Sequence, residues 1–358
     1  MSELLLNFVT NSIGPKANPK NIEIKKLFGQ ASYREYFRAS LTDNGQRTTK
    51  TYIIMQMPSG FSSPAEEITK IQEGAPTELP FINVNTYLAS LELPVPQIIA
   101  TNIDKGLILL EDLGDNSLEI AYRKAGPEFG LVYYKKAIDL LVHLQAKTHE
   151  NKSSHCIAYY RSFDQEMLNW EFNHFLEYGV EDRLSCTVSD TVKQNYKKIT
   201  ATLSQTINIM PQGFTHRDYQ SRNLMLYNYD FYLIDYQDAL VAPVLYDLVA
   251  LLRDSYICFS TDTKKALLNY YLEKLPSTHA YYQEKEKLYH DFHLLTIQRK
   301  LKDAGRFQFI HTVKNNSGFL QNIPQSFAYV KEALELCAQN EQAALLHQWL
   351  RENVEEFK

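Results

Sequence analysis

The apolar pattern of this chain changes its character near Gly114. Before that residue the sequence contains short β-branched and aromatic runs such as TYIIMQMP, whereas long amphipathic stretches such as YYKKAIDLLVHLQAKTH dominate after it. Strands followed by helices are typical of the α+β class, in which sheet and helices form separate layers; a doubly wound sheet would alternate the two. We therefore expect two lobes, a small N-terminal sheet lobe at 1–113 and a larger, mainly helical lobe at 114–358.

The length of the chain supports this division. A chain of 358 residues, of which 44% are hydrophobic, is long for one small core. Two lobes with a cleft between them are the arrangement that we expect for this length and composition.

Local patterns place the elements of the first lobe. Apolar runs on both sides of residues 43–45 predict a β-hairpin. The spacing of Phe81 and Leu88 predicts a helix that Pro94 ends. Two further strands, in QIIATNID and GLILLEDLG, are joined by a turn at 104–106.

The second lobe has two notable segments. NLML and FYLIDY, joined by YNYD, predict a small hairpin among the helices. The C-terminal stretch EALELCAQNEQAALLHQWLRENVEEF predicts an amphipathic helix that turns Leu334, Leu345, Leu346 and Leu350 inward.

Composition excludes several classes of protein. The net charge of -5 and the lack of a basic stripe disfavour nucleic acid or an anionic membrane as partner. The four cysteines form no CxxC pair, and the ten histidines show no metal-ligand spacing, so we expect neither disulfides nor a transition-metal site. No basic region precedes the short apolar N-terminal patch, and no run reaches the roughly 18 apolar residues that span a bilayer. We expect a cytoplasmic protein.

The stretch FTHRDYQSRNLML, residues 214–226, places ionisable groups where a buried loop is normally apolar. An Asp, an Asn five residues later and a hairpin that returns to another Asp would bring Asp218, Asn223 and Asp235 to one point. An amide and a carboxylate suit Mg²⁺ bound together with a nucleotide, which leaves Asp218 to face an acceptor hydroxyl. An isolated Asp is more often a turn residue, but the joint spacing of the three favours a site.

These residues carry a resemblance to a known family. HRDYQSRN is similar to the catalytic loop of protein-kinase-like enzymes, and IDYQD stands where their metal-binding D-F-G stands. The chain resembles more specifically the aminoglycoside-phosphotransferase-like branch and, within it, the bacterial N-acetylmuramate/N-acetylglucosamine anomeric kinases of cell-wall recycling. Six blocks between residues 22 and 333 carry this likeness: ASYREYFR, GLILLEDLG, HRDYQSRNLML, IDYQDAL, PVLYDLVALLRD and QRKLKDAGRF.

The resemblance implies a two-lobed, protein-kinase-like fold with ATP and Mg²⁺ in the cleft. It implies that Asp218 is the catalytic base and that Asn223 and Asp235 are the magnesium ligands.

It also implies nucleotide-binding residues in the first lobe. LLEDLG would be the hinge that holds adenine, at Glu111 to Leu113, and GQASYREYFR would be the loop over the phosphates. There the small Ser32 allows close backbone approach, and Arg34 and Arg38 can reach phosphate oxygens.

The chain departs from the family pattern in three places. Its phosphate loop has one glycine, and Gln30 stands where the sugar kinases usually have an acid. Met55 and Gln56 stand where most kinases carry a strand lysine, and Arg34 is the candidate replacement. QRKLKDAGRF differs from the family's more apolar form at Lys300, Asp303 and Arg306.

Several neighbouring residues have more than one interpretation. We expect His216 and Arg217 to be structural. Asp247 precedes a helical run and is best explained as its N-cap, although in the family the corresponding residue also steadies the catalytic loop.

The acceptor-side candidates are also open. Asp238 is either a turn residue or a polar substrate contact. Arg299 and Lys302 lie on an expected helix and could approach the acceptor or the phosphate; for Lys302 a solvated helical face is at least as good an explanation.

These observations predict a kinase that transfers the γ-phosphoryl group of ATP to the anomeric hydroxyl of an N-acetylated amino sugar. One alternative keeps the kinase but changes the acceptor to an aminoglycoside, choline, homoserine or another hydroxyl metabolite. Another, motivated by the missing strand lysine, is an inactive nucleotide-binding scaffold. Protein substrates are disfavoured because no A-P-E element follows IDYQDAL.

Overall fold

The computed structural model describes residues 2–14, 18–27, 34–43, 47–57 and 69–358. The chain forms two compact units, each built from three segments. The strand unit consists of Met1–Ile68, Pro94–Asn116 and Met225–Ile234. The helical unit consists of Thr69–Leu93, Ser117–Leu224 and Asp235–Lys358. The predicted α+β class is confirmed, since a strand-rich unit and a mainly helical unit are present.

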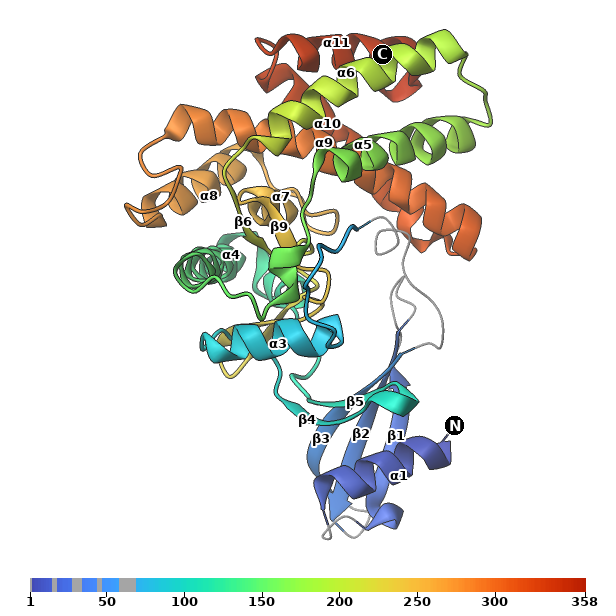
Figure 1. The fold of residues 1–358 in the computed structure, drawn as a ribbon, viewed down its shortest axis with the longest axis vertical. Helices are drawn as coiled ribbons and strands as arrows, with labels where there is room; N and C mark the ends of the chain where they lie inside the picture. Colours follow the sequence, from blue (N-terminus) through green and yellow to red (C-terminus); the bar gives the residue numbers. More distant parts are fainter. Residues whose placement is uncertain (1, 15–17, 28–33, 44–46, 58–68) are drawn as a thin grey trace. The chain divides into compact units, whose positions relative to one another are not determined.

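The strand unit is organised around a five-stranded antiparallel sheet of order β1-β2-β3-β5-β4 (Figure 1). Its elements are α1 (Ser2–Ile13), η1 (Pro19–Asn21), β1 (Ile22–Leu27), β2 (Glu35–Asp43), β3 (Arg47–Gln56), β4 (Ile98–Asn102), η2 (Ile103–Lys105) and β5 (Leu107–Glu111), with the hairpin β7 (Leu224–Tyr227) and β8 (Asp230–Leu233). The hairpins predicted around 43–45, 104–106 and YNYD are confirmed.

Alternation of side chains along the strands produces the core of this unit. Residues two apart point to the same face of a sheet, so Phe37 and Ala39 on β2 lie opposite Ile54 and Tyr52 on β3. All four are buried against α1, whose Val9 is fully buried with them. The helix α1 was missed, because its few apolar residues were considered only as a possible signal peptide.

The helical unit holds most of the helices. They are α3 (Pro80–Ser90), α4 (Leu118–Glu150), η3 (Ile157–Tyr160), α5 (Gln165–His174), the π-helix η4 (Phe175–Asp182), α6 (Asp190–Asn208), α7 (Tyr246–Leu252), α8 (Thr261–Lys274), α9 (Lys285–Lys314), η5 (Ser317–Asn322), α10 (Ile323–Leu336), α11 (Glu341–Asn353) and η6 (Glu355–Phe357). A two-stranded sheet joins β6 (Gln212–Thr215) to β9 (Leu240–Pro243). The predicted helix ending before Pro94 is confirmed as α3.

Helix α9 is the centre of the helical unit, where it packs against α5, η4, α7 and α10 (Figure 1). The crossing with the α5–η4 junction is close at Gly305. A Cβ atom there would stand 2.8 Å from Phe175 Cα and 2.9 Å from the carbonyl oxygen of His174. Only glycine permits this approach, which brings the residues flanking position 305 near α5.

The C-terminal stretch differs from its prediction as a single helix. It forms α10 and α11, with a break at residues 337–340 where Asn340 caps α11 by accepting from the N–H groups of Gln342 and Ala343. The break changes the direction of the inward face, so Leu345 is 40% exposed whereas Leu334, Leu346 and Leu350 are buried as predicted.

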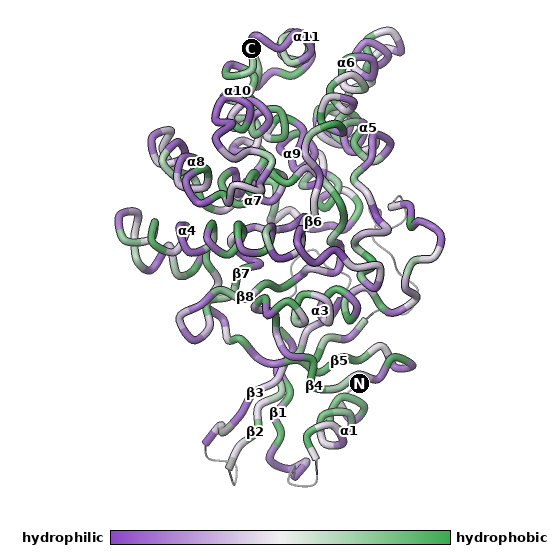
Figure 2. Tube along the Cα trace, turned by 60° about the vertical axis from the view of Figure 1, so that its left-hand side comes forward, coloured by the Kyte–Doolittle hydropathy of each residue, from purple (hydrophilic) through white to green (hydrophobic). Residues whose placement is uncertain are grey.

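Figure 2 shows hydrophobic and hydrophilic residues alternating along α4, as in a helix with one buried face. That helix is interrupted at Gly126, whose φ of 79° is left-handed, followed by Pro127. None of the helices in the described part of the chain is both long and apolar enough to cross a membrane.

Candidate active site

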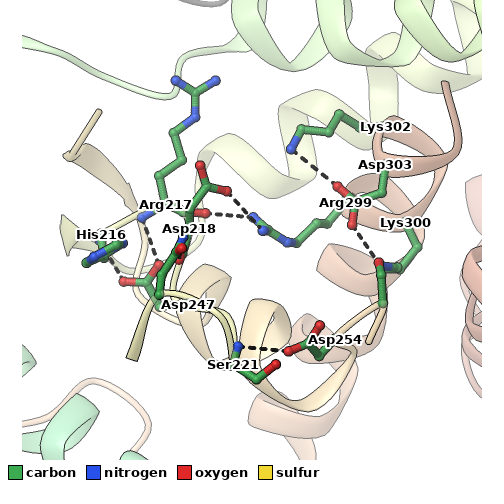
Figure 3. A network of polar contacts seen from close by, with 12 residues as sticks. His216, Arg217, Asp218, Ser221, Asp247, Asp254, Arg299, Lys300, Lys302 and Asp303 are labelled. Atoms are coloured by element: carbon green, nitrogen blue, oxygen red, sulfur yellow. Dashed lines mark hydrogen bonds and ion pairs between the residues drawn. The ribbon is translucent and has the colours of Figure 1, made fainter. Parts of the chain in front are cut away.

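The loop of residues 216–223 connects β6 to β7 and is held at its start by a buried carboxylate. Asp247 on α7 is 1% exposed, and its two oxygens accept from the N–H groups of His216 at 2.7 Å and Arg217 at 2.9 Å (Figure 3). Burial raises the pKa of Asp247 to about 7, although the two N–H donors oppose this shift.

This geometry corrects the predicted role of Asp247. The N-cap position of α7 is Leu245, and Asp247 lies two residues further inside. Its carboxylate therefore serves the loop instead of the helix end, as the family resemblance implied.

Arg217 has a left-handed backbone, with a φ of 76°, which is unfavourable for a residue with a side chain. Both sides of this residue are fixed. Its N–H donates to Asp247, and its carbonyl oxygen accepts from Arg299 Nη1 at 2.8 Å. The guanidinium of Arg217 reaches Glu171 of α5 at 3.4 Å, and both side chains are buried. The structural role expected for Arg217 is consistent with these contacts.

A second buried carboxylate holds the other end of the loop. Asp254, 2% exposed, accepts from the N–H of Ser221 at 2.8 Å. Within the loop, the carbonyl oxygen of Asp218 accepts from the N–H of Gln220 and from the side-chain amide of Asn223, each at 2.9 Å. The loop is thus braced from both ends and across its middle.

The carboxylate of Asp218 is the part of this loop that remains accessible. Its side chain is 36% exposed, whereas that of Arg299 beside it is 4% exposed; Arg299 Nη2 lies 3.4 Å from Asp218 Oδ1. Desolvation raises the pKa of Asp218, but attraction to Lys302, Arg299 and Arg217 outweighs it, so the pKa lies below its ordinary value. An ionised acceptor of hydrogen bonds is therefore held at a fixed place.

Helix α9 supplies further charges next to Arg299. The carboxylate of Asp303 accepts from Lys300 Nζ at 2.7 Å and from Lys302 Nζ at 3.3 Å, and Lys300 also donates to Ser255 at 2.8 Å. The interpretation of Lys302 as part of a solvated helical face is wrong, because its side chain is only 17% exposed. Lys302 lies one turn from Arg299, since residues three apart share a helix face.

The segment after β8 carries the other two acidic candidates. Asp235 has a left-handed backbone with a φ of 65°. Gln237 Nε2 donates to Asp235 Oδ1 at 2.9 Å and to Asp238 Oδ2 at 3.1 Å, so one amide holds both carboxylates. Arg161 in turn fixes Gln237 by donating to its carbonyl oxygen at 2.9 Å.

Asn223 and Asp235 have the chemistry that a hard divalent cation requires. The Asn223 amide nitrogen donates to the Asp218 carbonyl, which directs the amide oxygen away from that bond and leaves it as the atom for a ligand. The hairpin β7–β8 starts just after Asn223 and returns the chain just before Asp235. An amide oxygen and a carboxylate fit Mg²⁺ as partial ligands that leave room for phosphate oxygens.

The nucleotide-binding candidates belong to the strand unit. Ser32 lies outside the described residues. Arg34 is half-buried directly before β2, Glu111 ends β5 and accepts from the N–H of Gln97 at 3.2 Å, and Leu113 is buried.

Arg38 differs from its prediction as a phosphate contact. Its guanidinium is shared by Asp112, at 2.7 and 3.1 Å, and Asp115, at 2.8 and 2.9 Å. The charge of Arg38 is therefore compensated within the strand unit by two carboxylates.

Two residues of this network were missed in the sequence. Asp254 follows the apolar run of α7. It is the last residue of PVLYDLVALLRD, and no role was predicted for it. Glu171 stands on the apolar stripe of α5 between Leu168 and Phe175, and a charged residue on such a stripe is a signal for a buried partner.

The comparisons with known proteins agree with this geometry. Residues 26–284 match the family described as the phosphotransferase enzyme family. The chain belongs to that family and is an enzyme of the kinase class, which confirms the recognised resemblance and the prediction of an enzyme.

Individual proteins give more detail. The chain is 29% identical to an N-acetylmuramate/N-acetylglucosamine kinase of Pseudomonas putida over 309 residues, 85% of this chain and 81% of that one. A choline kinase structure from Cryptosporidium parvum has a TM-score of 0.63 at 14% identity and covers 98% of this chain and 99% of its own. The structure of amicoumacin kinase hAmiN in complex with AMP-PNP, Ca²⁺ and Ami has a TM-score of 0.55 at 11% identity, with 92% of each chain covered. Both structures resemble this chain in fold, which confirms the predicted protein-kinase-like fold class.

Proposed function

We propose that this chain transfers the γ-phosphoryl group of ATP to the anomeric hydroxyl of an N-acetylated amino sugar, N-acetylmuramate or N-acetylglucosamine. The observation that carries the proposal is the accessible carboxylate of Asp218 in a loop whose backbone is braced by two buried carboxylates. The likeness to the Pseudomonas putida kinase over most of both chains supports this choice of acceptor.

In the proposed reaction, Asp218 accepts a hydrogen bond from the anomeric hydroxyl and aims its oxygen at the γ-phosphorus. The new O–P bond forms while the bond from the γ-phosphorus to the β–γ bridging oxygen breaks, and ADP leaves. The hydroxyl proton passes to Asp218. Because the pKa of Asp218 is low, it takes the proton late, and its main contribution is orientation.

Two further residues are proposed on the acceptor side. Arg299 keeps Asp218 ionised and in place through its contact at 3.4 Å. Asp238, which Gln237 holds, is proposed to accept from a hydroxyl of the sugar.

Asn223 and Asp235 would hold Mg²⁺, and their oxygen atoms fit that ion. When bound, the ion neutralises part of the charge that develops on the phosphates. On the nucleotide side we propose Ser32, Arg34, Glu111 and Leu113, within the lobe predicted at residues 1–113. The structure of hAmiN with AMP-PNP supports a nucleoside triphosphate as the donor.

Cell-wall recycling in the cytoplasm is the proposed setting. It follows from the resemblance of the sequence blocks, and the Pseudomonas putida relative is named as a kinase of the same two amino sugars.

The test is an acceptor panel with the full chain, ATP and Mg²⁺. N-acetylmuramate, N-acetylglucosamine, choline, homoserine and an aminoglycoside are incubated separately, and products are assigned by phosphorus NMR. We expect sugar 1-phosphates, identified by coupling of the phosphorus to the anomeric proton. Phosphorylation of choline, homoserine or the aminoglycoside without either sugar would contradict the proposed acceptor.

A further inference from the structure

Helix α5 presents a row of polar side chains and one indole to a cavity. Gln165, Asn169 and Asn173 recur every four residues, which places them on one face of the helix. With Trp170 and Glu166 they line a cavity of about 490 Å³ that is open to solvent, and all of these lining residues belong to α5. Glu166 is exposed at this cavity and forms an ion pair with Lys70.

The amides and rings on this face have the properties of a ligand site. The oxygen Oδ1 of Asn169 and the nitrogen Nε2 of His174 are both buried and have no hydrogen-bond partner among the described residues. Such atoms are costly when unpaired, so a partner from outside the chain would stabilise them. Trp170 stacks on His174 with ring centroids 5.1 Å apart and an angle of 21°, which fixes the indole. An aromatic wall with a few polar groups is typical of a small-molecule site.

Helix α9 brings cations close to His174, on which Trp170 stacks. Gly305 touches the backbone of His174 and Phe175, so Lys302 and Arg306, on either side of Gly305, approach α5. The pKa of His174 lies at about 3, chiefly because of burial and then because Arg306 and Lys302 are near. Lys302 therefore lies near both His174 and Asp218, since its charge also acts on Asp218.

Of the two lysines that share the Asp303 carboxylate, Lys302 is the less tightly engaged. Asp303 is shared by Lys300 and Lys302, and the longer contact, 3.3 Å, belongs to Lys302. Arg299 and Lys302 project toward the space beside the Asp218 carboxylate in Figure 3.

The other carboxylates near this space are already engaged. Glu171 pairs with Arg217 and accepts from Gln298 at 2.7 Å. Asp247 and Asp254 accept from the backbone of the 216–223 loop.

We propose that α5 and α9 form an acceptor subsite in which Trp170 contacts the face of a sugar ring and Lys302 binds an anionic group. This inference rests on the proposed function and narrows it. Of the two amino sugars, N-acetylmuramate carries a carboxylate and N-acetylglucosamine does not. Lys302 therefore selects the acidic sugar.

The main test is Lys302→Met in the full chain, with KM and kcat measured for both sugars. We expect KM for N-acetylmuramate to rise about tenfold or more, as when a charge-assisted contact is lost. KM for N-acetylglucosamine should change less than about twofold. Asp303 keeps Lys300 as its partner in this variant, so the fold should persist, and the thermal unfolding midpoint checks this.

Two further variants complete the design. Lys302→Arg keeps the charge and should retain the preference for the acidic sugar. Lys287→Met removes an exposed lysine near the start of the same helix and should leave both KM values unchanged.

Trp170→Leu tests the ring contact independently of charge. We expect KM to rise about tenfold for both sugars, because the ring is common to them, and Trp170→Phe should recover part of the loss. Equal KM values for the wild-type chain and Trp170→Leu would remove Trp170 from the subsite.

The outcomes separate this inference from the function on which it rests. If the unaltered chain phosphorylates neither sugar, the proposed function fails and the subsite fails with it. If it phosphorylates both and Lys302→Met changes neither KM, or both equally, the selective role of Lys302 is overturned while the function stands.

Discussion

The strand unit and the helical unit differ in where they keep their charges. The core that α1 and the sheet share is made of apolar side chains. The ion pairs of that unit lie outside this core, at the surface for Lys26–Glu35 and partly buried for Arg38–Asp112. In the helical unit, Glu171 and Arg217 are paired in the interior. Apolar packing stabilises a sheet without directing any polar atom, whereas buried charges fix the atoms that they bond, at a cost in desolvation. Around its candidate site, the helical unit therefore fixes polar atoms with buried charges at a cost in desolvation.

The largest effect is expected at Asp218. Asp218→Asn removes the carboxylate that orients the acceptor and takes its proton, so phosphoryl transfer should fall about 100-fold or more. The measurement is the initial rate of transfer from labelled ATP.

The control for this variant is stability. The side chain of Asp218 is partly exposed, so the unfolding midpoint should change little. Turnover close to that of the unaltered chain would remove Asp218 from the mechanism.

The next effect tests the buried pair. Glu171→Leu leaves the Arg217 guanidinium buried without its carboxylate and should lower the free energy of unfolding by about 3–5 kcal/mol. Denaturant titration measures this loss. The double variant Glu171→Leu with Arg217→Met removes both charges and should lose less; a single-variant loss below about 1 kcal/mol would break the contrast between the units.

The third effect concerns pH and involves the helical unit. The pKa of His174 lies at about 3 and those of His279 and His293 at about 4, mainly because burial disfavours the charged ring. As the pH falls from the ordinary value of 6.5 toward 4, the unfolded chain binds protons that the folded chain does not. The contribution of these histidines to the free energy of unfolding is therefore fully present above that pH range and is lost as the pH falls through it.

His174→Phe isolates one of these groups. The fall in unfolding free energy between pH 7 and pH 5 should shrink by about 2 kcal/mol in this variant. The segments of the strand unit contain none of the ten histidines, so hydrogen exchange in its sheet should lack this dependence. An unchanged pH dependence in His174→Phe would show that His174 titrates normally.

The smallest effect is expected at the surface of the strand unit. Glu35→Gln breaks the pair with Lys26. The side chain of Glu35 is 37% exposed and that of Lys26 is 59% exposed, so the unfolding free energy should change by less than about 0.5 kcal/mol. The same denaturant titration provides the comparison with Glu171→Leu. A larger loss at Glu35 than at Glu171 would reverse the contrast.

Local patterns in the sequence determined much of the fold. Short apolar runs in β2, β3 and β5 and turn residues beside them were enough to predict the hairpins, because strand propensity and turn chemistry act over a few residues. Helix α3 followed in the same way from its spacing and from Pro94. The division of the C-terminal stretch into α10 and α11 was missed, because the cap at Asn340 lies within a run that is helical in composition.

The motif of Asp218, Asn223 and Asp235 was also present in the sequence, as was the family to which the chain belongs. What holds that motif was decided by the tertiary structure. Asp254 bonds Ser221 over 33 residues, Glu171 reaches Arg217 over 46, and Arg299 reaches Asp218 over 81. Such pairs produce no periodic pattern in the sequence, because their members meet only after helices from distant segments have packed together.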